Sequence, residues 1–104
     1  MNDADEKRVF SILIVDDEPN NIQLLANILN ENEYKIEFAT SGALALEWTA
    51  SKSFDLILLD IMMEGMDGFQ VCQKLKAAPE TQDIPVIFLT AKSEIEDLAR
   101  GFEL

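Results

Sequence analysis

A chain of 104 residues with 48% hydrophobic and 27% charged residues suits one small folded domain, and this composition excludes an intrinsically disordered chain. A net charge of −12 argues against direct binding to nucleic acid or to an anionic membrane surface, because both need basic residues on the protein. The absence of histidine excludes His–Cys zinc sites and Ser-His-Asp triads, and one cysteine, Cys72, is typical of a reducing compartment such as the cytoplasm.

The first half of the chain predicts two strand–helix units. Residues 1–8 are polar, and we expect a loose arm ahead of a domain that spans residues 9–104. An apolar run at 10–15 predicts a strand, and Pro19 marks the start of a helix. The run at 36–40 alternates around Glu37, which predicts a strand at an edge of the sheet. The residues expected to face the core from the first helix are Ile22, Leu25, Ile28 and Leu29.

The second half repeats the pattern. The runs at 54–59 and 86–90 are continuously apolar, as is typical of central parallel strands. Helix starts are expected at Ser41, Asp67 and Ser93, the last with a capping box. Four strand–helix units in alternation predict an α/β fold, a parallel sheet with helices on both faces. The residues expected to face the core from these helices are Leu44 and Trp48, then Phe69, Cys72 and Leu75, then Ile95, Leu98 and Phe102.

Carboxylates follow two of the predicted strands. Asp16, Asp17 and Glu18 follow the first strand, and Asp60 follows the third. In open parallel sheets, ligands bind outside the carboxyl ends of the strands. If these strands are neighbours, Asp16, Asp17 and Asp60 converge, and a divalent cation would relieve their repulsion. Oxygen ligands alone favour Mg²⁺, whereas Glu18 is better explained as an acid at a helix N-terminus.

A carboxylate beside Mg²⁺ can also act as a nucleophile and form an aspartyl phosphate, which is the chemistry that we predict for Asp60. Thr90 ends the fourth apolar run, where its hydroxyl would reach a phosphate oxygen, although threonine is also common in strands. P-loop and dinucleotide-binding motifs are absent from the sequence. The methionines of the same region, Met62, Met63 and Met66, are interpreted as loop packing and not as a soft-metal site.

Three separated segments, ILIVDDEPNN, LILLDIMMEGMDGF and VIFLTAKS, resemble the receiver domain of two-component response regulators. The resemblance runs from Ser11 to the end of the chain. It implies a flavodoxin-like, three-layer α/β fold with strand order 2-1-3-4, in which the family's fifth strand and helix are absent. It also implies a signalling domain in a phosphorelay, which takes a phosphoryl group from a sensor histidine kinase or a phosphotransfer protein onto Asp60.

The resemblance assigns a metal site around the acceptor. Asp16, Asp17 and Asp60 would hold Mg²⁺, directly or through water, and Met62 would contribute its backbone carbonyl. Glu64 stands where the family has a proline, which is expected to loosen the loop after Asp60 without removing a ligand.

The resemblance also assigns phosphate-binding groups after the fourth strand. Thr90 and the backbone N–H of Ala91 would bind the phosphoryl oxygens, and Met62 and Lys92 would flank the pocket. Lys92 does not correspond to the family's active-site lysine, because it follows the fourth strand directly. That lysine falls beyond Leu104, so slow or uncoupled phosphorylation is expected, together with self-association through strand 4 or helix 4.

Two other functions are compatible with the residues. One is an interaction module that keeps the fold but is not phosphorylated. The other is a Mg²⁺-dependent phosphohydrolase with Asp60 as nucleophile, which Met62 disfavours because it stands where a second acid would be needed.

Overall fold

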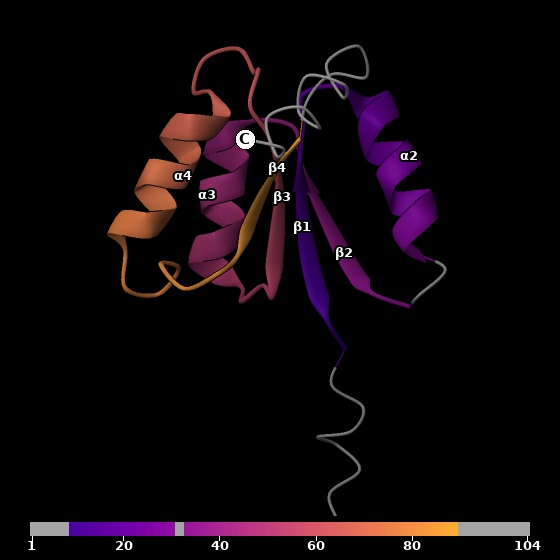
Figure 1. Ribbon diagram of the computed structural model, residues 1–104, viewed down its shortest axis with the longest axis horizontal. Coiled ribbons are helices and arrows are strands. Elements are labelled where there is room, and N and C mark those ends of the chain that lie inside the picture. The colour runs from indigo at the N-terminus through magenta and orange to yellow at the C-terminus, as the bar shows by residue number, and fades with distance from the viewer. Residues whose placement is uncertain (1–8, 31–32, 90–104) are drawn as a thin grey trace, which may run out of the picture.

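The computed structural model describes residues 9–30 and 33–89, which form a parallel sheet between two layers of helices (Figure 1). The strand order in this part of the chain is β2-β1-β3-β4, which confirms the predicted fold class. The predicted arm at 1–8 and the helix expected after Ser93 lie outside the described residues. The elements are β1 (Ser11–Val15), α2 (Pro19–Asn30), β2 (Lys35–Ala39), α3 (Gly42–Ser51), β3 (Leu56–Asp60), α4 (Gly68–Ala77) and β4 (Val86–Leu89).

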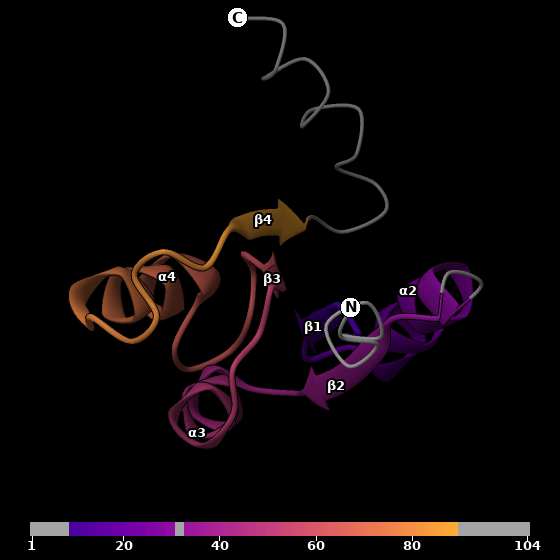
Figure 2. The ribbon, with the colours of Figure 1, turned by 90° about the horizontal axis from the view of Figure 1, so that it is seen from below.

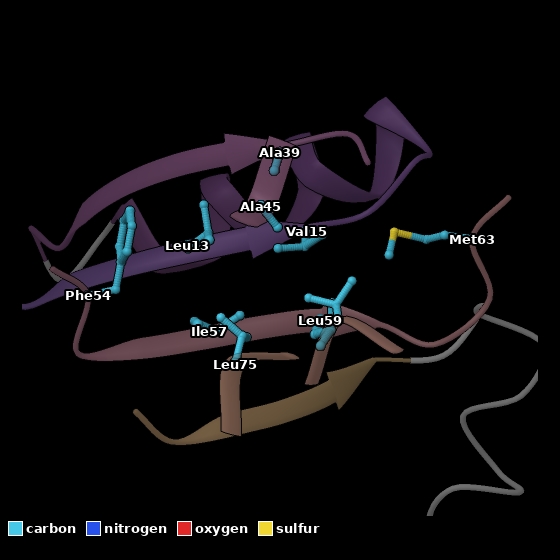
Figure 3. Close-up of a cluster of buried hydrophobic side chains, with 10 residues drawn as sticks. Leu13, Val15, Ala39, Ala45, Phe54, Ile57, Leu59, Met63 and Leu75 are labelled. Atoms are coloured by element: carbon cyan, nitrogen blue, oxygen red, sulfur yellow. The ribbon is translucent and has the colours of Figure 1, made fainter. Parts of the chain in front are cut away.

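Helices cover both faces of the sheet because side chains alternate along each central strand. Viewed along the sheet, α2 lies on one face, and α3 and α4 lie on the other (Figure 2). Leu13 and Val15 of β1 point into the core under α3 and α4, whereas Ile12 and Ile14 point toward α2. The residues that form the core on the side of α3 and α4 are Leu13, Val15, Ala39, Ala45, Phe54, Ile57, Leu59, Met63, Val71 and Leu75 (Figure 3).

The predicted helix stripes are only partly right. Ile22 of α2 is buried, as expected, but Ile28 is 55% exposed. In α3, Leu44 is 41% exposed, and the small Ala45 faces the sheet in its place. The prediction failed at these positions because both helices carry apolar residues on their outer faces as well, so spacing alone did not identify the side that packs.

The stripe predicted for α4 is wrong at its first residue. Phe69 is 57% exposed, whereas Val71 and Leu75 are buried against the sheet. Two residues along a helix correspond to a rotation of about 200°, so Phe69 points away from the face that Val71 occupies. Its ring lies instead against Phe88 of β4, with the centroids 5.2 Å apart.

The two edge strands of the described sheet differ. β2 lies at one edge, as its alternating sequence predicted, and Glu37 forms a salt bridge of 2.6 Å with Lys52. β4 lies at the other edge of this four-stranded sheet, although its continuous apolar sequence is typical of a central strand. Its Ile87 is 50% exposed. Among the helices that the structure describes, none is long and apolar enough to cross a membrane.

Candidate metal centre

Strand register brings two buried aspartates side by side. β1 pairs with β3 so that Val15 lies opposite Leu59, and the next residue of each strand is an aspartate, Asp16 and Asp60. Alternation along the strands places both side chains on the face of the sheet that α2 covers, the face to which Ile14 also points. The parallel arrangement therefore produces the carboxylate pair without any special loop conformation.

Asp17 completes a cluster of three carboxylates. Asp16, Asp17 and Asp60 each offer one oxygen, and these oxygens all lie within 4.8 Å of one another. Asp16 is 3% exposed and Asp60 is 7% exposed, whereas Asp17 is exposed at the rim. The structure thus brings together the three acids that the sequence analysis singled out.

Both oxygens of the Asp16 carboxylate accept hydrogen bonds from the residues that begin α2. The backbone N–H of Glu18 donates to Oδ1 at 2.9 Å, and the side-chain amide of Asn21 donates to Oδ2 at 3.2 Å. The backbone carbonyl of Glu18 also accepts hydrogen bonds from the N–H groups of Asn21 and Ile22, at the start of α2. The sequence analysis did not single out Asn21. The one sequence feature that could have identified it is its position as a polar residue in the first helical turn after the acids.

The loop after β3 holds the other two carboxylates. The backbone N–H of Met62 donates to Asp60 Oδ1 at 3.2 Å, and that of Glu64 donates to Asp17 Oδ2 at 3.4 Å. Glu64 therefore serves the site with its backbone, which any residue except proline could do. The Met62 side chain is 66% exposed at the rim of the site.

The electrostatics of the cluster are unfavourable without a cation. Burial, the negative charges of Asp16 and Asp17, and a hydrogen bond that protonated Asp60 donates to the Asp16 carboxylate raise the pKa of Asp60 from 3.8 to about 6, although the N–H of Met62 opposes the shift. Burial is the largest of these causes. The folded chain therefore holds a buried carboxylate that is costly to ionise, and a nearby positive charge would remove that cost.

These donors fit Mg²⁺. The cluster offers carboxylate oxygens only, with no sulfur or imidazole, and hard cations such as Mg²⁺ prefer oxygen. Asp17 is exposed, so the site is open on one side to water and to a phosphate group, which Mg²⁺ keeps among its ligands. A cation bound among the three carboxylates would lower the raised pKa of Asp60 and favour its ionised form.

The other predicted residues are placed as follows. Met63 is 8% exposed within the core and Met66 packs against the core, so both serve loop packing, as expected. The same interpretation is wrong for Met62, which is 66% exposed. Thr90, Ala91 and Lys92 lie outside the described residues, and their predicted roles at the phosphate stay predictions.

Gly68 allows α4 to begin directly beneath the site. A Cβ atom at this position would lie 2.8 Å from Ile61 Cα and closer still to the carbonyl oxygen of Asp60, both of them backbone atoms that cannot turn aside. Its N–H donates to the Ile61 carbonyl at 2.9 Å, which ties the helix to the end of β3. The position of Asp60 therefore depends on the absence of a side chain at Gly68.

We expect Gly68→Ala to lower the free energy of unfolding by about 1 to 3 kcal/mol, because the backbone around Asp60 must move to admit a methyl group. Urea denaturation measures this change. Gly65→Asn is the comparison, since Gly65 has open space around it. Its positive φ of 76° strains any side chain, least of all asparagine, so we expect a smaller loss of stability there than at Gly68. Equal stability of Gly68→Ala and the wild type would show that the backbone there yields easily.

Comparisons with known proteins identify the family to which this domain is similar. The family model of the response regulator receiver domain matches residues 12–104. A probable cyclic di-GMP phosphodiesterase of Vibrio cholerae is 50% identical over 94 residues, which is 90% of this chain and 21% of that protein. The response regulator PleD of Caulobacter vibrioides is 46% identical over 92 residues, 88% of this chain and 20% of PleD. The chain thus spans about a fifth of the length of these relatives.

One solved structure to which the chain is similar contains a bound metal ion. The response regulator TrrA of Thermotoga maritima, solved in complex with Mg²⁺ and BeF, superimposes with a TM-score of 0.74 and is 36% identical. The match covers 89% of this chain and 80% of TrrA.

Proposed function

We propose, because the chain belongs to the response regulator receiver domain family, that Asp60 accepts a phosphoryl group in a reaction that requires Mg²⁺. The observation that carries this proposal is the cluster of Asp16, Asp17 and Asp60 at the carboxyl ends of β1 and β3. The cluster offers one carboxylate as a nucleophile and two further carboxylates, with oxygens within 4.8 Å, that can hold a cation beside it. Phosphoryl transfer to a carboxylate uses this combination of groups.

Each residue of the cluster has a separate part in this chemistry. A carboxylate oxygen of Asp60 attacks phosphorus, and the bond from phosphorus to the donor breaks as the acyl phosphate forms. Mg²⁺, when bound, supplies the positive charge that offsets the approach of an anion to three carboxylates. Asp16, Asp17 and Asp60 would hold that ion, directly or through water, and we propose that the Met62 backbone carbonyl joins them. Thr90 and the backbone N–H of Ala91 would bind the phosphoryl oxygens, and Met62 and Lys92 would flank the pocket.

The donor that we propose is a phosphohistidine of a sensor kinase or of a phosphotransfer protein, and we place the domain in the cytoplasm. The relatives support the first point, because several are named response regulators. A single cysteine, which is free in the structure, suits a reducing compartment. The role is that of a signalling domain whose phosphoryl charge alters the surface around the site.

A small-molecule donor tests this function without the cognate kinase. We expect acetyl phosphate with Mg²⁺ to add the mass of one phosphoryl group, as measured on the intact protein, and EDTA to prevent the addition. Intact folding and Mg²⁺ binding without any labelling would favour an interaction module that is not phosphorylated. Repeated turnover of p-nitrophenyl phosphate would instead favour a phosphohydrolase.

We also propose that copies of this chain associate through β4. This strand lies at an edge of the described sheet, and Ile87 is 50% exposed on it. Apolar edge strands readily pair with another chain. We expect light scattering after size exclusion to show a dimer or larger species at high micromolar concentration, and Ile87→Lys to shift it toward monomer. A monomeric wild-type chain under the same conditions would rule this out. The alternative contact through the helix after Ser93 lies outside the described residues.

A further inference from the structure

The carboxylate of Asp16 is held from both ends before any ligand arrives. Its Oδ1 accepts from the N–H of Glu18 at 2.9 Å, and its Oδ2 accepts from the amide Nδ2 of Asn21 at 3.2 Å. A buried aspartate with one donor can still turn about its last bond, whereas donors to both oxygens fix the plane of the carboxylate. The Glu18 donor is a backbone group, so among the residues that the structure describes Asn21 provides the only side-chain donor to Asp16.

The position of Asn21 is itself fixed by the fold. Ile22, the next residue, is buried against the core of the α2 face, which sets the rotation of the helix about its axis. The backbone N–H of Asn21 is already bonded to the Glu18 carbonyl at 3.0 Å, so its side chain is not needed to cap the helix. Asparagine is also a weak helix former, and its presence in the first turn does not follow from helix stability.

Asn20 provides an internal comparison. It lies in the same turn of α2 and has the same side chain, but it is exposed. Within the described part of the chain its amide makes no hydrogen bond to the three carboxylates, whereas that of Asn21 reaches Asp16. The contact of Asn21 therefore depends on its place in the helix and is not a general property of this polar turn.

We infer that Asn21 is a positioning residue for the metal: its amide holds Asp16 in the orientation that directs an oxygen toward Asp17 and Asp60. This inference rests on the proposed function, because it assumes that the three carboxylates bind Mg²⁺. Donors that orient a metal ligand commonly account for a tenfold to hundredfold change in metal affinity. A residue that only joined β1 to α2 would affect folding but not this affinity.

Replacement of each asparagine by leucine separates these roles, since leucine has nearly the same size and lacks the amide. We expect Asn21→Leu to raise the dissociation constant for Mg²⁺ about tenfold, as measured by calorimetric titration with MgCl₂. Asn20→Leu should leave it unchanged. Melting temperatures of both variants in EDTA report any loss of folding, and Asn21→Ala repeats the test with a smaller side chain.

Three results would overturn the inference. If the wild type and Asn21→Leu bind Mg²⁺ equally, Asn21 does not position Asp16, and the proposed function still stands. If both leucine variants lose affinity alike, the effect belongs to the helix turn and not to the Asn21 amide. If the wild-type chain does not bind Mg²⁺ at all, the proposed function fails together with the inference.

Discussion

Asp60→Asn is expected to abolish labelling by acetyl phosphate and, in EDTA at pH 8, to raise the free energy of unfolding. The first effect follows from the loss of the nucleophilic carboxylate. The second follows from the pKa of Asp60, which the fold raises from 3.8 to about 6. That shift corresponds to at most about 3 kcal/mol. Solvent near the rim screens the charges, so we expect a gain of about 1 to 2 kcal/mol.

The same pKa shift determines whether the free energy of unfolding rises or falls with pH. Between pH 3.8 and about 6, the folded metal-free chain binds more protons at Asp60 than the unfolded chain does. The contribution of Asp60 is therefore favourable at low pH and is lost as the pH rises through this window. Asp60→Asn should flatten the plot of the free energy of unfolding against pH between pH 3.8 and about 6. Asp83→Asn removes an exposed charge and serves as the control. If Asp60→Asn were less stable than the wild type at pH 8 in EDTA, burial and the neighbouring carboxylates would not destabilise the ionised form of Asp60.

Asp17→Asn is expected to weaken Mg²⁺ binding by about a hundredfold, since even partners outside the first shell account for tenfold to hundredfold changes. Asp17 is exposed, so asparagine of the same shape should cost little packing. Without that ligand, Mg²⁺ should no longer stabilise the fold. In the wild type, Mg²⁺ at 100 times its dissociation constant should add about 2.7 kcal/mol to the free energy of unfolding.

Glu18→Gln is the matched control for this prediction. Glu18 is the next residue and is exposed, and it contacts the site through its backbone. The substitution removes the same unit of charge from the same turn but no carboxylate of the cluster. A loss of Mg²⁺ affinity as large as that of Asp17→Asn would mean that overall charge, and not coordination by Asp17, attracts the ion.

The fold was largely predictable because its signals are local and repeated. Apolar runs alternating with helical spacing implied a parallel sheet, and Glu37 correctly placed β2 at an edge. The faces of the helices were less predictable. Phe69 and Leu44 are as apolar as the residues that pack, and only the sheet determines that Val71 and Ala45 are buried in their place.

The candidate site was predictable to the level of its carboxylates and no further. Asp16 and Asp60 each follow an apolar run, so neighbouring strands had to bring them together. The hydrogen bond from Asn21 depends on how α2 is rotated, which Ile22 sets through tertiary packing. The close approach of Gly68 to the end of β3 likewise depends on the path of the loop and not on local sequence.

The most direct measurement is to locate the phosphoryl group itself. After reaction with acetyl phosphate and Mg²⁺, borohydride reduces an aspartyl phosphate to homoserine, and peptide mass spectrometry identifies the converted position. We expect conversion at residue 60 alone, dependent on Mg²⁺ and absent from Asp60→Asn. Conversion at another carboxylate, or none in a folded chain that binds Mg²⁺, would contradict the assignment of Asp60 as the acceptor.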